Sequence, residues 1–355
     1  MDKDAIYSEV TPQDLSEAIV DEYGAMYSKD GERLLKGVNT EEYAVREGTR
    51  VICYQAFAKC RELAKINIPE SVTSIGMLAF YRCDGLTSID IPKNMKKIEV
   101  FAFSECSGLT SIHIPKSVRE IGNHAFEGCS SLTSIHIPKN VRVIGTHAFS
   151  MCVGLTSISI HNGITKIEGG AFADCPLIEK IEVDKGNTIY DSRDGCNAII
   201  RRDGSNVILI AGCKNTRIPD EVTEIECYAF SGCSGLTNIR IPDGVTRIGE
   251  SAFSDCSALT SIHIPDGVTR INSLVFSGCS ALTSINIPDG VTGIGYFAFQ
   301  GCTNLTSIRF PDSITDIDLF VFDECESLKT IEIPQHSFNK FAKLLPEKKR
   351  LLVEK

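Results

Sequence analysis

The chain has 355 residues, with 46 acidic and 36 basic side chains and a formal net charge of −10. This balance argues against nucleic acid or an anionic membrane as the main partner, because both require a basic surface. No apolar stretch reaches the length of about 18 residues that a membrane span needs, so none is predicted.

Residues 1–46 are interpreted as an N-terminal cap. Their start lacks a basic segment followed by an apolar run, so no signal peptide is predicted. Thr11 followed by Pro12 and an acidic helical pattern predicts a short helix. Asp30-Gly31, between apolar residues, predicts a hairpin that shields the open edge of the next coil.

From residue 47 the chain repeats a 23-residue unit, with eleven phenylalanines in register and a cysteine three residues after each. A period of about 20 to 50 residues is typical of a solenoid, whose coils bury their apolar sides against their neighbours. We predict repeats over residues 47–182 and 220–334. The phenylalanines are Phe57, Phe80, Phe103, Phe126, Phe149, Phe172, Phe230, Phe253, Phe276, Phe299 and Phe322.

One repeat shows how a coil is expected to form. Leu132, Ile135 and Ile137 give an alternating pattern that predicts a short strand with one face inward. Pro138 ends this strand, and the next two residues (Lys-Asn here, Asp-Gly in other copies) favour a turn. Ala148 and the following phenylalanine are predicted to open a tight helical turn. Paired strands of successive coils lie about 4.8 Å apart, so each position becomes a ladder.

This pattern, L-x-x-I-x-I-P-x-x-V-x-x-I-G-x-x-A-F-x-x-C, resembles the BspA-like, or Treponema pallidum-type, leucine-rich repeats over residues 47–334. The resemblance implies a curved, right-handed leucine-rich repeat solenoid of short strands and short helical turns. Some members of that family are bacterial surface proteins that adhere to host matrix proteins. The fold alone names no ligand.

Residues 183–219 interrupt the period with a second hairpin signal. Asp203-Gly204 aligns with Asp30-Gly31, and both lead into repeats, so the chain reads as hairpin plus repeats written twice. We interpret this segment as an enlarged coil that continues the stack, because both of its strands are strongly apolar. A flexible hinge is the alternative.

Residues 335–355 are predicted to form a C-terminal capping helix, interrupted near Pro346, over the last coil. Its basic remainder leaves a second interpretation open, in which the helix binds a membrane surface or a partner.

Eleven of the fifteen cysteines belong to the repeat, where a small buried hydrophobe is expected. Neighbouring thiols lie within disulfide range in such a ladder, but identical side chains pointing the same way are poorly aimed at each other. Free thiols are therefore predicted, which favours a cytoplasmic location. Cell-surface or secreted placement is the alternative if a leader was removed.

Neither a metal, a cofactor nor an enzyme is predicted. His113 and His136 occupy equivalent positions, as do His124 and His147, but no further ligand completes a metal site. The repeated serines form no triad with histidine and aspartate, and no phosphate-binding loop occurs. An enzyme with cryptic sites would require turnover that depends on His113 or His136.

Two variable columns of the repeat are candidate binding surfaces. The first lies between the two strand isoleucines and faces outward beside a serine-rich column, giving a mixed-charge polar strip. Its candidate residues are Asp90, His113, His136, Glu182, Arg240, His263 and Arg309. Ordinary solvated sheet surface is the alternative.

The second column is the pair of residues before Ala-Phe, which is apolar in several copies. Tyr296-Phe297 and Leu319-Phe320 are expected to form one patch where consecutive coils stack. This apolar edge would contact a protein or a second copy, unless one residue of each pair is buried in the turn.

These observations favour a non-enzymatic scaffold that presents a repeat surface to a protein ligand. The resemblance implies the alternative of an exported bacterial adhesin that binds host matrix proteins. Neither interpretation involves nucleic acid.

Overall fold

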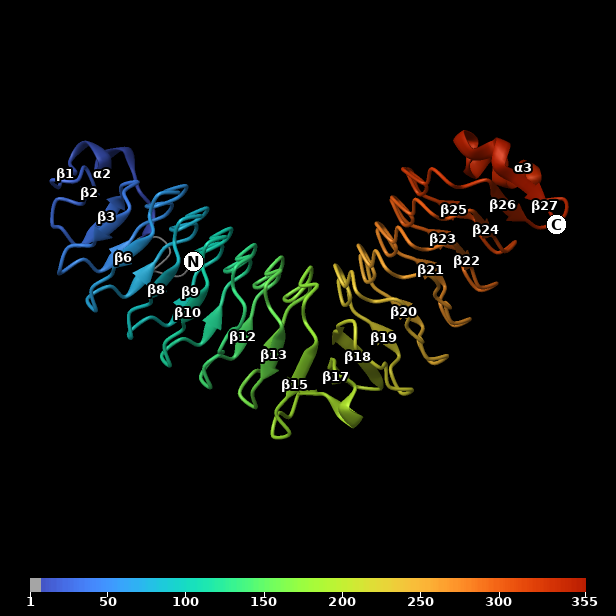
Figure 1. Ribbon diagram of the computed structural model, residues 1–355, viewed down its shortest axis with the longest axis horizontal. Helices are drawn as coiled ribbons and strands as arrows, with labels where there is room; N and C mark the ends of the chain where they lie inside the picture. The colour runs from blue at the N-terminus through green and yellow to red at the C-terminus, as the bar shows by residue number, and fades with distance from the viewer. Residues whose placement is uncertain (1–7) are drawn as a thin grey trace. The chain divides into compact units, whose positions relative to one another are not determined.

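The computed structural model describes residues 8–355, which fall into two compact units (Figure 1). The first unit extends to Cys175 and includes Asp184–Asn187, whereas the second comprises Pro176–Val183 and Thr188–Lys355. The beginning of the predicted cap, where no signal peptide was expected, lies outside the described residues.

From Val10 on, the described part of the first unit consists of a short helix and a series of short strands. They are α2 Pro12–Ser16, β1 Ile19–Val20, β2 Met26–Tyr27, β3 Arg33–Lys36, β4 Glu42–Ala44, β5 Val51–Ile52, β6 Lys65–Asn67, β7 Ser74–Ile75, β8 Ser88–Asp90, β9 Lys97–Ile98, β10 Ser111–His113, β11 Glu120–Ile121, β12 Val143–Ile144, β13 Ser157–Ile160 and β14 Lys166–Ile167.

The second unit is again mainly short strands, with its helices near the two ends. Its elements are β15 Lys180–Val183, β16 Tyr190–Asp191, η1 Arg193–Gly195, β17 Ile199–Asp203, β18 Asn206–Ala211, β19 Glu224–Ile225, β20 Arg247–Ile248, β21 Arg270–Ile271, β22 Ser284–Asn286, β23 Gly293–Ile294, β24 Ser307–Arg309, β25 Asp316–Ile317, β26 Thr330–Ile333, α3 Phe338–Leu344, η2 Pro346–Leu351 and β27 Leu352–Glu354.

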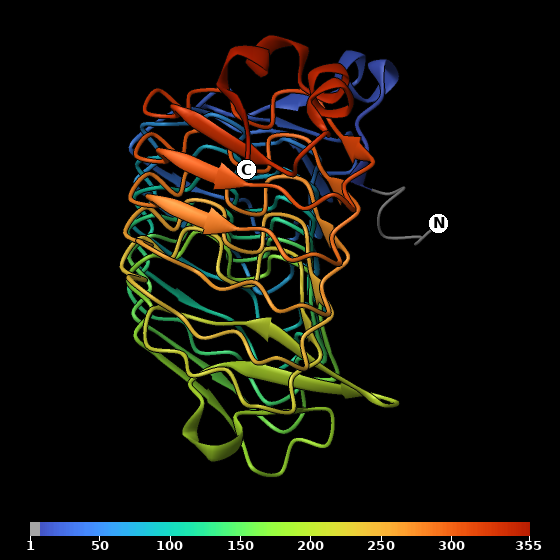
Figure 2. The ribbon, with the colours of Figure 1, turned by 90° about the vertical axis from the view of Figure 1, so that its right-hand side faces the viewer.

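Most coils contribute two strands, which join two parallel ladders. The first strand is absent from three coils, at residues 132–137, 236–241 and 259–264, so the strand predicted over residues 132–137 does not form. Ile112 of β10 lies opposite Ile89 of β8, and Ile121 of β11 lies opposite Ile98 of β9, one repeat earlier in both cases. In the second unit β24 pairs in parallel with both β22 and β26, and the orange strands of Figure 2 lie one above another. The predicted leucine-rich repeat solenoid is confirmed.

The turn that carries the phenylalanine is not helical, contrary to the prediction. His124 and Gly128 adopt left-handed backbone, with φ of 56° and 70°, so the chain cannot continue a right-handed helix. Within the turn, Cys129 N donates to Phe126 O (3.2 Å), whereas Phe126 N donates to Ala148 O of the next coil (2.9 Å). The turn thereby becomes a third hydrogen-bonded ladder between coils.

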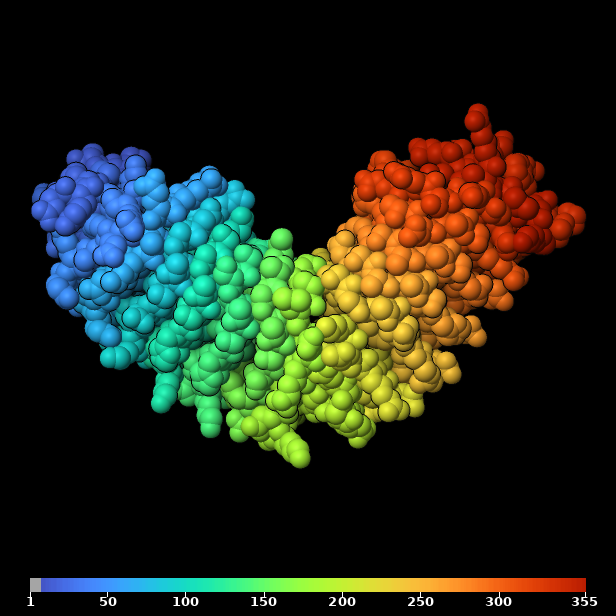
Figure 3. All heavy atoms as spheres, in the orientation of Figure 1, coloured from blue at the N-terminus to red at the C-terminus, as the bar shows by residue number. Residues whose placement is uncertain are grey.

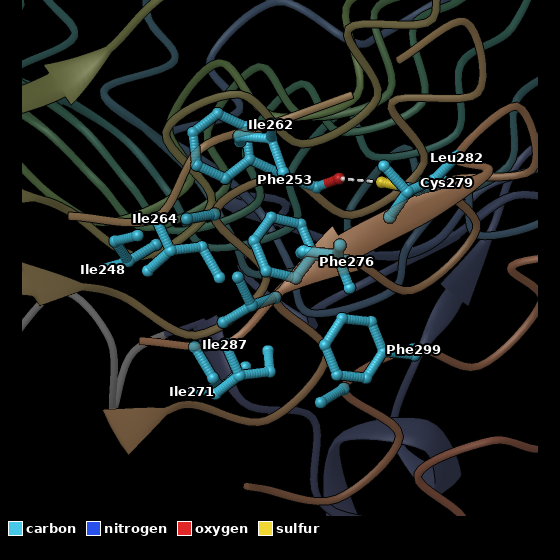
Figure 4. Packing of buried hydrophobic residues seen from close by; sticks show 14 of the residues in the cluster. Ile248, Phe253, Ile262, Ile264, Ile271, Phe276, Cys279, Leu282, Ile287 and Phe299 are labelled. Carbon is cyan, nitrogen blue, oxygen red and sulfur yellow. Dashed lines mark hydrogen bonds between the residues drawn. The ribbon is translucent and has the colours of Figure 1, made fainter. Parts of the chain in front are cut away.

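The core of the second unit is a continuous column of repeat side chains. Phe253, Phe276 and Phe299 are fully buried, with successive ring centroids 5.9 and 5.6 Å apart (Figure 4). The Cys279 thiol donates to Phe253 O (3.2 Å), an oxygen that also accepts from Cys256 N (3.3 Å). Cysteine suits this position because it is small enough for the ladder and still supplies a weak donor.

Both predicted hairpin signals correspond to antiparallel strand pairs, β2 with β3 and β17 with β18. In each pair the second strand then runs parallel to a strand of its own unit. β3 pairs with β5, and β18 pairs with β19. Each hairpin therefore feeds the parallel ladder of the unit that contains it, as an enlarged coil would.

The C-terminal segment is less helical than predicted. Helix α3 is followed by η2, since Pro346 cannot donate to a continuing helix and disfavours helical backbone at Leu345. β27 then pairs in parallel with β26, adding a strand to the last coil. Phe341 is fully buried and its ring lies 5.8 Å from that of Phe310. These elements cover the end of the second unit (red in Figure 3).

Candidate interaction surfaces

The polar strip lies on the outward positions of the first ladder. In the first unit Asp90 and His113 are direct partners across β8 and β10, and His136 occupies the same position one repeat later. All three side chains are exposed. In β8 and β10 this exposure follows from the alternation of successive strand residues between faces, whereas His136 lies in a coil without the first strand.

The polar-strip residues of the second unit are also exposed: Glu182, Arg240, His263 and Arg309. Glu182 pairs with Lys180 (2.8 Å) and Arg240 with Asp220 (2.6 Å). His263 and Arg309 form no ion pair within residues 8–355. The seven candidates therefore divide between the two units, three in the first and four in the second.

The apolar edge of the second unit is exposed. The exposed fractions are 48% for Tyr296, 63% for Leu319 and 48% for Phe320, while Phe297 is half-buried. The rings of Phe297 and Phe320 stack with their centroids 5.3 Å apart. In these two repeats neither residue of the apolar pair is fully buried in its turn.

Backbone conformation explains the exposure. Phe297 and Phe320 adopt left-handed backbone, with φ of 56° and 61°. The same repeat position is left-handed at Leu274, whose N–H donates to Tyr296 O of the next coil (2.9 Å). Left-handed backbone costs about 1–2 kcal/mol in a residue with a Cβ. At Leu274 the hydrogen bond to the next coil offsets that cost. The left-handed backbone leaves the apolar side chains of Phe297 and Phe320 on the outside of their coils.

The edge continues into a small hollow beside the C-terminal elements. This hollow has a volume of about 60 Å³ and is lined by Leu319 and Phe320 on one side and by Leu344 and Pro346 on the other. Asp318, Glu347 and Lys348 lie at its border. A side chain inserted beside Phe320 would therefore meet apolar walls and a charged rim.

The equivalent column of the first unit has a different character. Tyr54, Met77 and Val100 line a hollow of about 480 Å³, together with Val10, Ser8, Glu9, Ser74 and Glu99. Farther along, Phe101 stacks on His124 (4.4 Å), which stacks on His147 (5.3 Å). The apolar column of this unit thus passes into a histidine stack.

Those histidines do not form a recognisable metal centre. His124 Nδ1 contacts Glu127 Oε2 (3.0 Å), and burial lowers the pKa of His147, with His124 lowering it further. Among the described residues, no group of three or more histidine, cysteine, aspartate or glutamate side chains is arranged to hold a metal ion. Nor does this part of the chain contain a helix long and apolar enough to cross a membrane.

All fifteen cysteines are free in the structure. Fourteen are buried and Cys227 is half-buried. Burial raises the pKa of the Cys152 and Cys279 thiols to about 12, which keeps them protonated and unreactive near neutral pH.

The turn after the first strand carries a charge pattern that the repeat consensus conceals. In the first unit the residue after proline is Lys93, Lys116 or Lys139 in three successive coils. In the second unit the same position is aspartate in five successive coils, at Asp220, Asp243, Asp266, Asp289 and Asp312. Comparing the two blocks column by column would have found this difference from sequence.

Comparison with family models gives matches to the BspA type leucine rich repeat region over residues 31–152, 102–193, 210–329 and 275–344. No curated protein matches the chain. Among solved structures, a leucine rich cell surface protein from Faecalibacterium prausnitzii is 29% identical, with a TM-score of 0.74, covering 92% of this chain and 97% of that one.

Two further solved structures share the fold. The pneumococcal vaccine antigen PcpA has a TM-score of 0.72 at 21% identity, over 89% of this chain and 87% of that one. A leucine-rich repeat protein from Eubacterium ventriosum has a TM-score of 0.63 at 23% identity, over 90% of this chain and 88% of that one.

Proposed function

Because the chain belongs to the BspA-type leucine-rich repeat family, we propose that it is a non-enzymatic scaffold that binds a protein ligand through the apolar edge of its second unit. The observation that carries the proposal is the exposure of Tyr296, Leu319 and Phe320 beside the half-buried Phe297, whose ring stacks on Phe320. Large aromatic anchors on a rigid frame dominate the free energy of protein binding, since little side-chain entropy is lost when they are covered.

The polar strip would complement this anchor. Arg309 and His263 are exposed and unpaired within the described residues, so they are available to charged or hydrogen-bonding groups of the ligand. Polar contacts around an apolar centre mainly select the partner and its orientation. In the first unit, Asp90, His113 and His136 would have the same role.

The experiment compares protein capture by the native chain, by Phe297→Ser/Phe320→Ser and by Met151→Ser/Val153→Ser. The second pair is the matched control, because Met151 and Val153 are exposed apolar residues that belong to the first unit and not to the edge. We expect the edge variant to bind an identified, purified ligand on the order of 30-fold or more weakly, and the control to bind like the native chain. If the two variants bind the ligand equally well, the apolar edge is not the binding site.

The apolar edge of the second unit is also suited to self-association. A second candidate function, an exported adhesin, follows from the comparisons. The Faecalibacterium protein is described as a cell surface protein and matches nearly over its whole length. That similarity supports an exported adhesin, whereas the ladder of free thiols supports the cytoplasm. Labelling intact native cells with an antibody against the folded chain distinguishes the two locations, and binding of host matrix proteins then tests adhesion.

A further inference from the structure

We propose that the two charged rows on the proline turns are a salt-sensitive interface between copies of this chain. The basic ridge, defined as Lys93, Lys116 and Lys139 of the first unit, would bind the acidic ridge of a second molecule. The acidic ridge is defined as Asp220, Asp243, Asp266, Asp289 and Asp312 of the second unit. This inference is independent of the apolar edge.

Both ridges stand on the same local structure. In all of these coils except that of Asp312, the residue after proline lies in a turn closed by a backbone hydrogen bond to the proline carbonyl, as from Val141 to Pro138 (2.9 Å) and from Val268 to Pro265 (3.0 Å). Every lysine and aspartate of the two ridges is exposed. Strands of successive coils lie about 4.8 Å apart where they pair, and because the coils have one repeat length we expect a similar spacing of successive charges in both ridges.

Few of these charges are compensated within the chain. Lys93 pairs with Glu70 (3.3 Å), Asp220 with Arg240 (2.6 Å) and Asp312 with Lys340 (3.1 Å). The remaining ridge residues, which form no ion pair within residues 8–355, are Lys116, Lys139, Asp243, Asp266 and Asp289. Like charges on adjacent coils repel each other, so an opposite row is needed to offset the repulsion.

The neighbouring column strengthens the contrast. Beside the basic ridge it contains Lys96, Arg119 and Arg142, whereas beside the acidic ridge it contains only threonine, from Thr223 to Thr315. The first unit thus presents a double basic row and the second a single acidic one. The same turn accommodates lysine in the first unit and aspartate in the second, so the turn geometry does not dictate the sign of the charge.

A second copy fits these ridges better than another anion does. The acidic ridge supplies negative charges at the spacing of the lysines, because both rows derive from the same position of the same repeat. The contact joins unlike surfaces, so it produces a closed pair if two molecules exchange both contacts and a longer chain otherwise.

The test is sedimentation of the full chain at low and high salt. We expect association at about 10 mM NaCl and its loss at about 1 M, where the Debye length falls from about 30 Å to about 3 Å. Association that survives high salt, or requires Phe297 and Phe320, would assign the contact to the apolar edge and overturn the proposal.

Two neutralised variants make the test specific. One carries Lys93→Gln, Lys116→Gln and Lys139→Gln, and the other carries Asp243→Asn, Asp266→Asn and Asp289→Asn. Each is expected to stay monomeric alone, yet an equal mixture should form heterodimers, since one variant retains the acidic ridge and the other the basic ridge. Recovery on mixing also shows that both variants are folded.

Two results would overturn the proposal. In one, the variants associate as strongly as the native chain. In the other, the native chain is monomeric at low salt but binds heparin, used as a polyanion probe, and loses this binding in the lysine variant. That outcome would assign the basic ridge to an anionic polymer.

Discussion

Gly37 lies so close to Phe57 that a Cβ at its position would stand 2.1 Å from the Cε1 atom of the ring. The second unit repeats this relationship, with 2.2 Å between a Cβ at Gly212 and Cε1 of Phe230. Each glycine follows a hairpin and faces the first phenylalanine of its unit. The two hairpins therefore enter their ladders in the same way, which agrees with a sequence that is written twice.

Gly37→Ala should destabilise the first unit by about 1–3 kcal/mol, the usual range for overpacking a core. The ring of Phe57 cannot retreat, because it is fully buried and stacks 5.2 Å from Phe80. Urea denaturation measures the change. Gly169→Ala is the control, since a Cβ there meets nothing within 4 Å, and equal stability of the two variants would contradict the account.

The sequence predicted the fold because its information is periodic. The residue types at Phe126, Cys129 and Leu132 recur at fixed intervals along the repeats. One coil conformation, repeated along the chain, buries these positions in every coil. Conformation within a coil was harder to predict. His124 is left-handed because its N–H is drawn to the next coil, and no residue type at that position signals this.

The candidate surfaces were predicted in part. The exposure of the polar strip followed from alternation, whereas the unusual apolar pairs left open whether one residue of each pair is buried in its turn. The charged ridges were missed, because Lys139 and Asp266 each look like an ordinary turn residue within one coil. Strand β27 was missed because its three residues, Leu352–Glu354, are too few to show a strand pattern in the sequence. They form a strand because they pair with the open edge of β26.

Native thiols should react very unequally. A thiol reagent at about pH 8 is expected to modify Cys227 first, since it is half-buried while the other fourteen are buried. Cys227→Ser should remove this fast reaction, and denaturation without reductant should then release fourteen thiols in the variant and fifteen in the native chain. A lower number after isolation from native cells would instead show disulfides and an oxidising compartment.

Phe341→Ala should loosen the end of the second unit, with a loss of about 3–5 kcal/mol for a fully buried phenylalanine. The ring stacks on Phe310, and its loss weakens the attachment of β27 to β26. An uncovered β26 edge favours aggregation, so light scattering should rise together with the fall in stability. Phe338→Ala is the control, because Phe338 is only half-buried, and an equal loss there would argue against a specific role of Phe341.

Acid should destabilise the first unit through His147. Burial lowers the pKa of this imidazole below its usual 6.5 and the neighbouring His124 lowers it further, while Glu127 and Asp174 oppose the change. The unfolded chain therefore binds the proton at higher pH than the folded chain. Stability is complete above about pH 6.5 and decreases as the pH falls from there through the lower folded pKa.

His147→Gln should reduce this acid dependence, measured as the free energy of unfolding at a series of pH values from about 7.5 to about 5. Part of it should remain, because burial also lowers the pKa of His161. His113→Gln is the matched control, since that side chain is exposed on the polar strip and is not part of the histidine stack. If His147→Gln and the native chain lose stability equally with acid, the histidine stack is not the source of the effect, and the carboxylates of the first unit would have to explain it.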